Sequence, residues 1–336
     1  MMGYSVHLAQ VNDRVGLCVM TIIFTLMGVL AIVFRFYARR LTRMYLGADD
    51  WLALVSFVFI LALNAIFLSG TIQGAITGHS VVVNNWPVSN DLEHLAQKYK
   101  YAFQLTEKFV FGFIKLSILF LWKRLFRQAR SFVILCWVMI AVITAWFIVF
   151  FFITLFQCGT HWDWNWAPIG FQLTQCVSVL DTLTAFSASD LFTDFVILFM
   201  PIYPVWQLHM PLKKKVGVTG IFMIGFFTIG AGIARMYYYL VTSFDKEDNP
   251  DFIADFTLFI LWSEIEANVA MLVCCMPTWG PVMGRFRDRL GHLLQSTVLG
   301  KWIPLPVGNK THEYSFEMSK SRRLASSSTG ALTGDV

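Results

Sequence analysis

The sequence predicts an all-α membrane protein: a seven-transmembrane helix bundle with its N-terminus outside and its C-terminus in the cytoplasm. Hydrophobic residues make up 57% of the 336 residues and charged residues only 14%, whereas soluble proteins have about 25% charged residues. The apolar residues fall into runs long enough to cross roughly 30 Å of hydrocarbon, which takes about 20 helical residues. The expected spans lie near residues 15–37, 51–73, 102–122, 132–156, 178–206, 216–241 and 253–277.

The distribution of Lys and Arg predicts the orientation of these spans. The loops after the first, third and fifth spans are rich in Lys and Arg, as is the segment after the seventh. The loop after the fourth span has neither, and the loop after the sixth is mostly acidic. Because Lys and Arg are enriched in cytoplasmic loops, we expect the basic loops inside. Their basic residues are Arg39, Arg40, Arg43, Lys123, Arg124, Arg127, Arg130, Lys213, Lys214, Lys215, Arg285, Arg287 and Arg289.

Three segments are expected to lie outside the bundle. Residues 1–14 form a short extracellular N-terminus. Residues 284–300 place apolar side chains on one helical face, which is typical of a helix lying on membrane lipid. Residues 301–336 are rich in Ser and Thr and are expected to be a disordered cytoplasmic tail. The formal charge of +5 is confined to clusters beside apolar runs, so we expect no nucleic-acid partner.

Two cysteines bracket the loop after the fourth span. Cys158 and Cys176 are expected to face the oxidising outside and to form a disulfide. Trp162, Trp164 and Trp166 lie between them. These tryptophans fit a belt at the membrane interface or a lid over the bundle, and the belt is favoured.

Charged residues inside the spans are candidate functional side chains, because each costs about 2.5–3.5 kcal/mol at the bilayer centre unless it has a partner or water. Asp190 and Asp194 are one helical turn apart and share a face. Glu264 and Glu266 point about 200° apart, so only one can face the same interior. Helical depth predicts an outer cluster of Glu107, Asp190 and Arg235, and a deeper cluster of Asp194, Glu266 and Lys115.

These charges leave three functions open: ion pairs that hold the helices together, a ligand or ion site, or a proton pathway. The ligand-site hypothesis is an outward-facing pocket between the third, fifth, sixth and seventh spans, beneath the Cys158–Cys176 loop. Glu107, Asp190 and Arg235 would line it, with Asp194 and Glu266 below them.

The sequence also argues against several chemistries. All seven histidines fall in loops or tails, so an intramembrane zinc hydrolase is not expected. The seventh span contains no lysine that could form a retinal Schiff base. We therefore expect no cofactor, no metal, no catalytic residue and no enzymatic activity.

Several motifs occur in a characteristic order. Asp49, Asp50 and Trp51 open the second span, and Lys115 begins the Lys-Leu-Ser-Ile-Leu run in the third. The later motifs are Cys158 with Cys176, the run from Asp190 through Pro201 and Trp206 to Lys214, Trp262 with Glu266, and Cys275 with Pro277. Together they cover about residues 20–285, and the chain resembles the fungal rhodopsin-like-domain integral membrane proteins. That group includes satratoxin-cluster-type membrane proteins and receptor-like proteins linked to plant infection.

The resemblance implies a seven-helix protein with an extracellular N-terminus and a receptor-like or accessory role; "rhodopsin" describes the architecture, not bound retinal. Some relatives carry a cysteine-rich extracellular domain, which is not expected here because about fourteen residues without cysteine precede the first span. Asp49 and Asp50 are expected to be structural, supplying the N-cap, complementing the helix dipole and pairing with arginines of the first loop. Trp51 is expected to anchor the helix at the interface.

The sequence therefore predicts a receptor-like (GPCR-like) sensor of an unknown extracellular small-molecule ligand, in the plasma membrane or an internal membrane. The basic loops would contact a cytoplasmic signalling partner or lipid. The alternative is a proton-coupled transporter or an accessory membrane protein of a secondary-metabolite (toxin) biosynthetic pathway. A scaffold for other membrane enzymes is a third interpretation.

Overall fold

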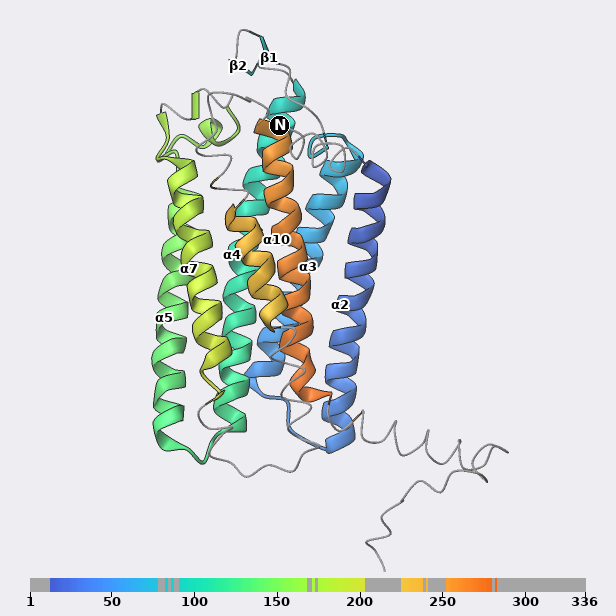
Figure 1. Cartoon of the computed structure of the whole chain (residues 1–336), viewed down its shortest axis with the longest axis vertical. Helices are drawn as coiled ribbons and strands as arrows, with labels where there is room; N and C mark the ends of the chain where they lie inside the picture. Colours follow the sequence, from blue (N-terminus) through green and yellow to red (C-terminus); the bar gives the residue numbers. More distant parts are fainter. Residues whose placement is uncertain are drawn as a thin grey trace, which may run out of the picture. The chain divides into compact units, whose positions relative to one another are not determined.

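The computed structural model describes residues 13–77, 82–83, 86–87, 91–167, 171–172, 175–202, 225–237, 240, 252–279 and 282. Within these residues the regular secondary structure is helical, apart from two short paired strands, and the long helices run side by side (Figure 1). The helices are α2 (Arg14–Thr42), α3 (Ala48–Ile72), α4 (Asp91–Leu125), α5 (Arg130–Leu155), α7 (Val179–Phe199) and α10 (Phe252–Cys275). Residues 225–237 form a further helical stretch. The short elements are β1 (Val82–Val83), β2 (Trp86–Pro87), η1 (Trp162–Trp166) and η2 (Met276–Thr278).

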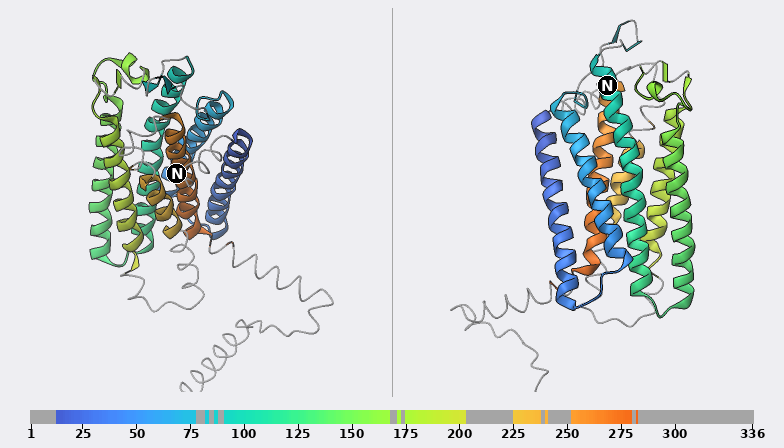
Figure 2. Two further views of the ribbon diagram at one scale, coloured as in Figure 1. Left: turned by 45° about the horizontal axis from the view of Figure 1, so that its top comes forward. Right: turned by 180° about the vertical axis from the view of Figure 1, so that it is seen from behind.

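Five helical segments of the described chain are long and apolar enough to cross a membrane: Arg14–Thr42, Ala48–Ile72, Arg130–Leu155, Asp181–Phe199 and Thr257–Thr278. The chain is thus a multi-pass helical membrane protein. α2 and α5 lie at opposite edges of the bundle in the front and rear views (Figures 1 and 2). α4 lies between them and carries charged side chains within its length, which makes it the helix around which the candidate site is built.

The two largest differences from the predicted span boundaries are at the start of α4 and at the end of α7. α4 begins at Asp91 rather than near residue 102, because a helix can continue beyond the apolar stretch that marks a span. α7 ends at Phe199 rather than near residue 206. Pro201 follows it, and proline removes a backbone donor and clashes with the preceding turn. The predictions for residues 1–12, 203–224, 241–251, 284–300 and 301–336, which include the first part of the sixth span, lie outside the described residues.

The buried core lies on both sides of α4. Towards α3 and α10, fully buried side chains include Leu63, Phe103 and Phe259. Towards α5 and α7, a second cluster includes Leu119 and Ile143. Since both clusters share α4, this helix is fixed by apolar packing on two sides and can hold charged side chains in defined positions.

The loop between α5 and α7 is closed by the predicted disulfide. Cys158 and Cys176 are bonded, with an S–S distance of 2.02 Å, which confirms that prediction. Asn165 of η1 is buried and accepts a hydrogen bond from Gln157 at 3.0 Å. His94 of α4 lies with Nδ1 2.9 Å from the Trp166 carbonyl oxygen. The loop therefore packs on the first turns of α4, which the belt interpretation of its tryptophans did not anticipate.

Candidate functional site

Seven ionisable side chains from four helical segments meet inside the bundle, and we call them the central network. Six of them are at most 2% exposed, and the seventh, Asp194, has a side chain that is 21% exposed. α4, α7, the 225–237 helix and α10 all contribute. The members are Glu107, Lys108, Lys115, Asp190, Asp194, Arg235 and Glu266.

Arg235 connects three carboxylates of this network, those of Glu107, Asp190 and Glu266. Its Nη1 donates to Glu107 Oε1 at 3.0 Å and its Nη2 donates to Asp190 Oδ2 at 2.7 Å. Its Nε lies 3.2 Å from Glu266 Oε2, without hydrogen-bond geometry. Lys108 pairs with the other oxygen of Glu107 at 2.9 Å. One guanidinium therefore joins carboxylates from three helices, and its planar fork suits that task better than an ammonium would.

Lys115 connects the two aspartates of α7. Its Nζ lies 2.7 Å from Asp190 Oδ1 and 2.9 Å from Asp194 Oδ1. It also donates to the Asp190 carbonyl oxygen at 2.8 Å and to Thr193 Oγ1 at 2.7 Å. The two clusters expected at different depths are therefore one network, because residues one turn apart lie close enough for one ammonium to reach both.

The charges of the central network do not balance. Four carboxylates face three basic groups, which leaves one excess negative charge when all are ionised. Neither carboxylate oxygen of Glu266 has a hydrogen-bond partner. Burying an uncompensated charge costs several kcal/mol. The network therefore favours binding of a proton or of a positively charged group at Glu266 and its neighbours.

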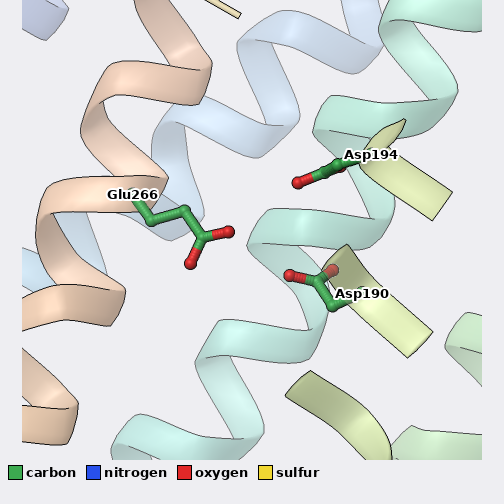
Figure 3. A group of neighbouring side chains, drawn as sticks. All are labelled: Asp190, Asp194 and Glu266. Carbon is green, nitrogen blue, oxygen red and sulfur yellow. The ribbon is translucent and has the colours of Figure 1, made fainter. Parts of the chain in front are cut away.

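Asp190, Asp194 and Glu266 direct their carboxylates towards one another from α7 and α10 (Figure 3). One oxygen from each lies within 4.8 Å of the others, a spacing that could hold a metal ion. Lys115 and Arg235 lie within 3.2 Å of these same carboxylates. Their positive charges would repel a divalent cation, so the arrangement is better suited to a monovalent or organic cation than to a metal centre.

A cavity of about 60 Å³ adjoins the network at Lys115 and Asp194. It extends along α4 and α7 towards their ends at Leu125 and Phe199, lined by Ile118 and Trp122 on α4 and by Ile197 and Leu198 on α7. Trp122 Nε1 is buried without a hydrogen-bond partner. The cavity thus combines an apolar wall with an accessible carboxylate. The outward-facing pocket on the other side of the network stays a prediction.

A second charged cluster joins the end of α2 to the start of α3 and the end of α4, and we call it the terminal network. Its members are Arg35, Arg39, Asp49, Asp50 and Arg124. Each of its four carboxylate oxygens accepts a hydrogen bond. Arg35 also donates to the Cys274 carbonyl oxygen of α10 at 2.7 Å. Four helices are therefore tied at one end of the bundle.

The structure assigns positions to the remaining residues of the sequence motifs. The N-cap of α3 is Gly47, not an aspartate, and Asp50 accepts a hydrogen bond from the Gly47 amide at 3.2 Å. Trp51 is exposed on the outside of α3, as an interface anchor would be. Trp262 is half-buried on α10.

The two glutamates of α10 face different sides. Glu266 joins the central network, whereas Glu264 does not. Glu264 is fully buried, and neither of its carboxylate oxygens has a hydrogen-bond partner. Near its backbone, Asn268 donates to the Glu264 carbonyl oxygen and exchanges hydrogen bonds with Asn64 of α3. The sequence showed that the two glutamates diverge, and the structure shows which one meets Arg235.

Sequence reasoning missed three members of these networks. Arg35 lies inside the apolar run of α2 and was not recognised as an intramembrane charge. Its spacing from Arg39, one helical turn, was the available signal. Lys108 was not among the candidate site residues. Arg124 was assigned only to a basic loop, because no local pattern indicates that it pairs with Asp49.

A bundle of apolar helices with an ion-paired interior defines a multi-pass membrane protein rather than a soluble helical bundle. The fungal rhodopsin domain matches residues 34–285, and the chain belongs to that family. The matched range includes both charged networks and the disulfide loop.

Curated relatives are similar over different parts of the chain. Polyenoic acids biosynthesis gene cluster protein Ba17b of Metarhizium anisopliae is 23% identical over 268 residues, which are 78% of this chain and 71% of that protein. A SAT4 family membrane protein of Emericella nidulans is 29% identical over 162 residues, 46% of this chain and 40% of that protein. Satratoxin biosynthesis SC1 cluster protein 4 of Stachybotrys chartarum is 26% identical over 183 residues, 54% of this chain and 62% of that protein. The match therefore spans less than two thirds of the latter two relatives.

Proposed function

We propose that this chain is a seven-span, receptor-like protein of the plasma membrane, with its N-terminus outside, that binds a small molecule at the central network. The observation that carries the proposal is the excess negative charge of that network beside a cavity lined by Asp194. A ligand with a positively charged group would supply the missing charge. Its apolar part would occupy the cavity.

Binding of this kind would change how α4 and α7 are paired. An amine that pairs with Asp194 would compete with Lys115 for that carboxylate. Lys115 would keep Asp190 as its partner, so one contact between α4 and α7 is exchanged while the other persists. A ligand shifts a conformational equilibrium only through such a differential contact. The basic loops that follow α2 and α4 would pass the change to a cytoplasmic signalling partner, and no enzymatic step or nucleic-acid partner is involved.

Ligand binding can be tested with the purified full chain in lipid nanodiscs. A panel of small apolar amines, each with a neutral isostere, would be screened for a rise in unfolding temperature. We expect some amines but not their isosteres to stabilise the protein, and Asp194→Asn to weaken their affinity by at least about tenfold. Asp181→Asn, on the exposed first turn of the same helix, is the matched control. The proposal fails if no amine stabilises the protein, or if Asp194→Asn binds as well as the unmodified chain.

The orientation has its own test. Single cysteines placed in the loops after α2, α4 and α5 would be treated with a membrane-impermeant thiol reagent on intact cells, in a background where Cys18 is replaced. Labelling only of the loop after α5 supports the N-terminus outside. Labelling of the loop after α2 or α4 contradicts it.

Proton-coupled transport, or an accessory role in secondary-metabolite biosynthesis, is the second candidate. The same excess charge could be neutralised by a proton, and several relatives carry the names of biosynthesis cluster proteins. Proteoliposomes with an imposed pH gradient would distinguish transport from sensing. Proton flux that requires the chain and is lost in Asp194→Asn would favour transport. A chain that neither carries protons nor binds amines, but is labelled by proximity with biosynthetic enzymes, would favour a scaffold.

A further inference from the structure

Glu264 of α10 is a buried carboxyl group that belongs to neither charged network. Its side chain is fully buried, and both carboxylate oxygens are closed to solvent and lack a hydrogen-bond partner. Glu266, two residues further along the helix, pairs with Arg235 of the central network. Because the two glutamates point about 200° apart, Glu264 lies on the other face of α10, away from that arginine.

The polar side chains on this face of α10 and on the helices beside it are uncharged. Asn268, one turn after Glu264, exchanges hydrogen bonds with Asn64 of α3 at 3.1 and 3.2 Å. Asn64 also donates to Thr25 Oγ1 of α2 at 2.9 Å. Thr21, one turn before Thr25, lies beside the Glu264 carboxyl. Glu264 therefore sits where α2, α3 and α10 meet, in hydrogen-bonding but neutral surroundings.

No basic side chain in the described part of the chain pairs with Glu264. Arg35 is bound to the terminal network, and Lys108 and Lys115 are bound to acids of the central network. An ionised Glu264 would thus be an uncompensated buried charge, which is strongly unfavourable. The ionisable side chains within the adjoining helices are Cys18 and Arg35 on α2, Tyr99, Lys100, Tyr101, Glu107, Lys108 and Lys115 on α4, and Glu266 on α10 itself, whereas α3 has none between Trp51 and Ile72.

The burial of Glu264 restricts what can neutralise it. Because neither oxygen has open surface, a metal ion, an organic cation or a water molecule has no room beside the carboxyl, whereas a proton needs none. The hydroxyl of Thr21 donates its hydrogen to the Leu17 carbonyl oxygen at 3.0 Å. Its oxygen can therefore accept a hydrogen bond from a carboxylic acid, but it has no hydrogen to donate to a carboxylate.

We propose that Glu264 is a proton-binding site, separate from the central network, whose protonated carboxyl donates a hydrogen bond to Thr21 Oγ1 and so joins α10 to α2. Release of the proton to water would leave an unpaired carboxylate between these helices. The folded chain therefore holds one more proton than the unfolded chain wherever a free glutamate is ionised, and this proton makes the folded state less stable as the pH rises. The proposal does not depend on any ligand of the central network.

Infrared spectroscopy of the purified full chain in lipid nanodiscs at neutral pH tests the protonation directly. The difference spectrum between the unmodified chain and Glu264→Gln should contain the carbonyl stretching band of a protonated carboxylic acid. The matched control is Asp181→Asn, on the exposed first turn of α7, whose difference spectrum should contain carboxylate bands instead. Carboxylate bands in the Glu264→Gln difference spectrum would show that Glu264 is ionised and would overturn the proposal.

The acceptor is tested without altering Glu264. Thr21→Val keeps the shape of the side chain and removes the hydroxyl, so the carbonyl band of Glu264 should move to higher frequency as its O–H loses its partner. Thr21→Ser restores the hydroxyl and should return the band to its original position. A band that stays in place in Thr21→Val would overturn the contact between Glu264 and Thr21.

The dependence of unfolding on pH gives a second, independent measurement. Glu264→Gln keeps the size of the side chain and a hydrogen-bond donor but cannot ionise. Relative to this variant, the unfolding equilibrium constant of the unmodified chain in detergent should rise about tenfold per pH unit between about pH 5 and 7. Asp181→Asn should keep the pH profile of the unmodified chain. Parallel profiles for the unmodified chain and Glu264→Gln would contradict the proposed proton site.

Discussion

The central and terminal networks are both buried and both join several helices, yet their hydrogen bonding differs. In the terminal network three arginines face two aspartates, and every carboxylate oxygen accepts a hydrogen bond. Its excess charge is positive and lies beside Arg124, whose side chain is 30% exposed. In the central network acids outnumber bases, and both oxygens of Glu266 lack hydrogen bonds.

This difference separates a structural role from a functional one. A satisfied ion cluster holds helices together, and its surplus charge costs little where water can reach it. An unsatisfied carboxylate within the bundle lowers stability unless something binds to it. Unpaired buried polar groups in a folded protein therefore point to a ligand, a proton or a strained functional site. The terminal network is therefore expected to hold the helix ends together, and the central network is where we propose that a ligand or a proton binds.

The largest effect is expected from removing Arg235. Arg235→Leu leaves Glu107, Asp190 and Glu266 buried without their shared cation, and should lower the free energy of unfolding by about 3–5 kcal/mol. Denaturant unfolding of the purified chain in detergent measures this loss. A variant of unchanged stability would show that the central network does not hold the helices.

A smaller loss is expected from Arg35→Leu in the terminal network. Asp49 and Asp50 would keep Arg39 and Arg124 as partners, so the loss should be about 2–3 kcal/mol. Arg40→Leu is the control, because Arg40 is exposed beside Arg39 and should change stability by no more than about 0.5 kcal/mol. Equal losses of stability in Arg35→Leu and Arg40→Leu would contradict the role of Arg35 in holding the helix ends together.

Asp50→Asn tests a satisfied carboxylate. The amide oxygen can still accept a hydrogen bond, but the attraction of Arg35 and Arg39 to a negative charge is lost. We expect the thermal unfolding midpoint to fall, corresponding to about 1–2 kcal/mol. An unchanged midpoint would mean that the charge on Asp50 contributes nothing to the terminal network.

Glu266→Gln should have the smallest effect and the opposite sign. Neutralising this side chain removes the excess negative charge of the central network, so stability should stay the same or rise by up to about 1 kcal/mol. Thermal unfolding of this variant beside Asp50→Asn gives the sharpest comparison between the networks. A drop as large as that of Asp50→Asn would show that Glu266 is already satisfied in the resting protein.

The sequence predicted what depends on spacing along the chain. Apolar runs gave the helices, the loop without Lys or Arg suggested where a disulfide could form, and the i, i+4 spacing placed Asp190 and Asp194 on one face. The contact between Asp190 and Arg235, expected from matched depths on adjacent spans, is present.

Contacts that depend on how each helix is rotated could not be predicted. Arg35 donates a hydrogen bond to the carbonyl oxygen of Cys274, more than two hundred residues away. No local sequence pattern predicts that contact. The extension of α4 to Asp91 was missed for a related reason, because hydropathy marks where a helix enters lipid and not where it begins. The cavity beside Lys115 and Asp194 is formed by side-chain packing between helices. No local pattern in the sequence predicts its position.

Lys115 lies between two carboxylates that belong to successive turns of α7. Its ammonium contacts both carboxylates at once, so one aspartate can move away while the other still covers the charge of Lys115. A small shift of α7 along α4 therefore does not leave this ammonium without a partner.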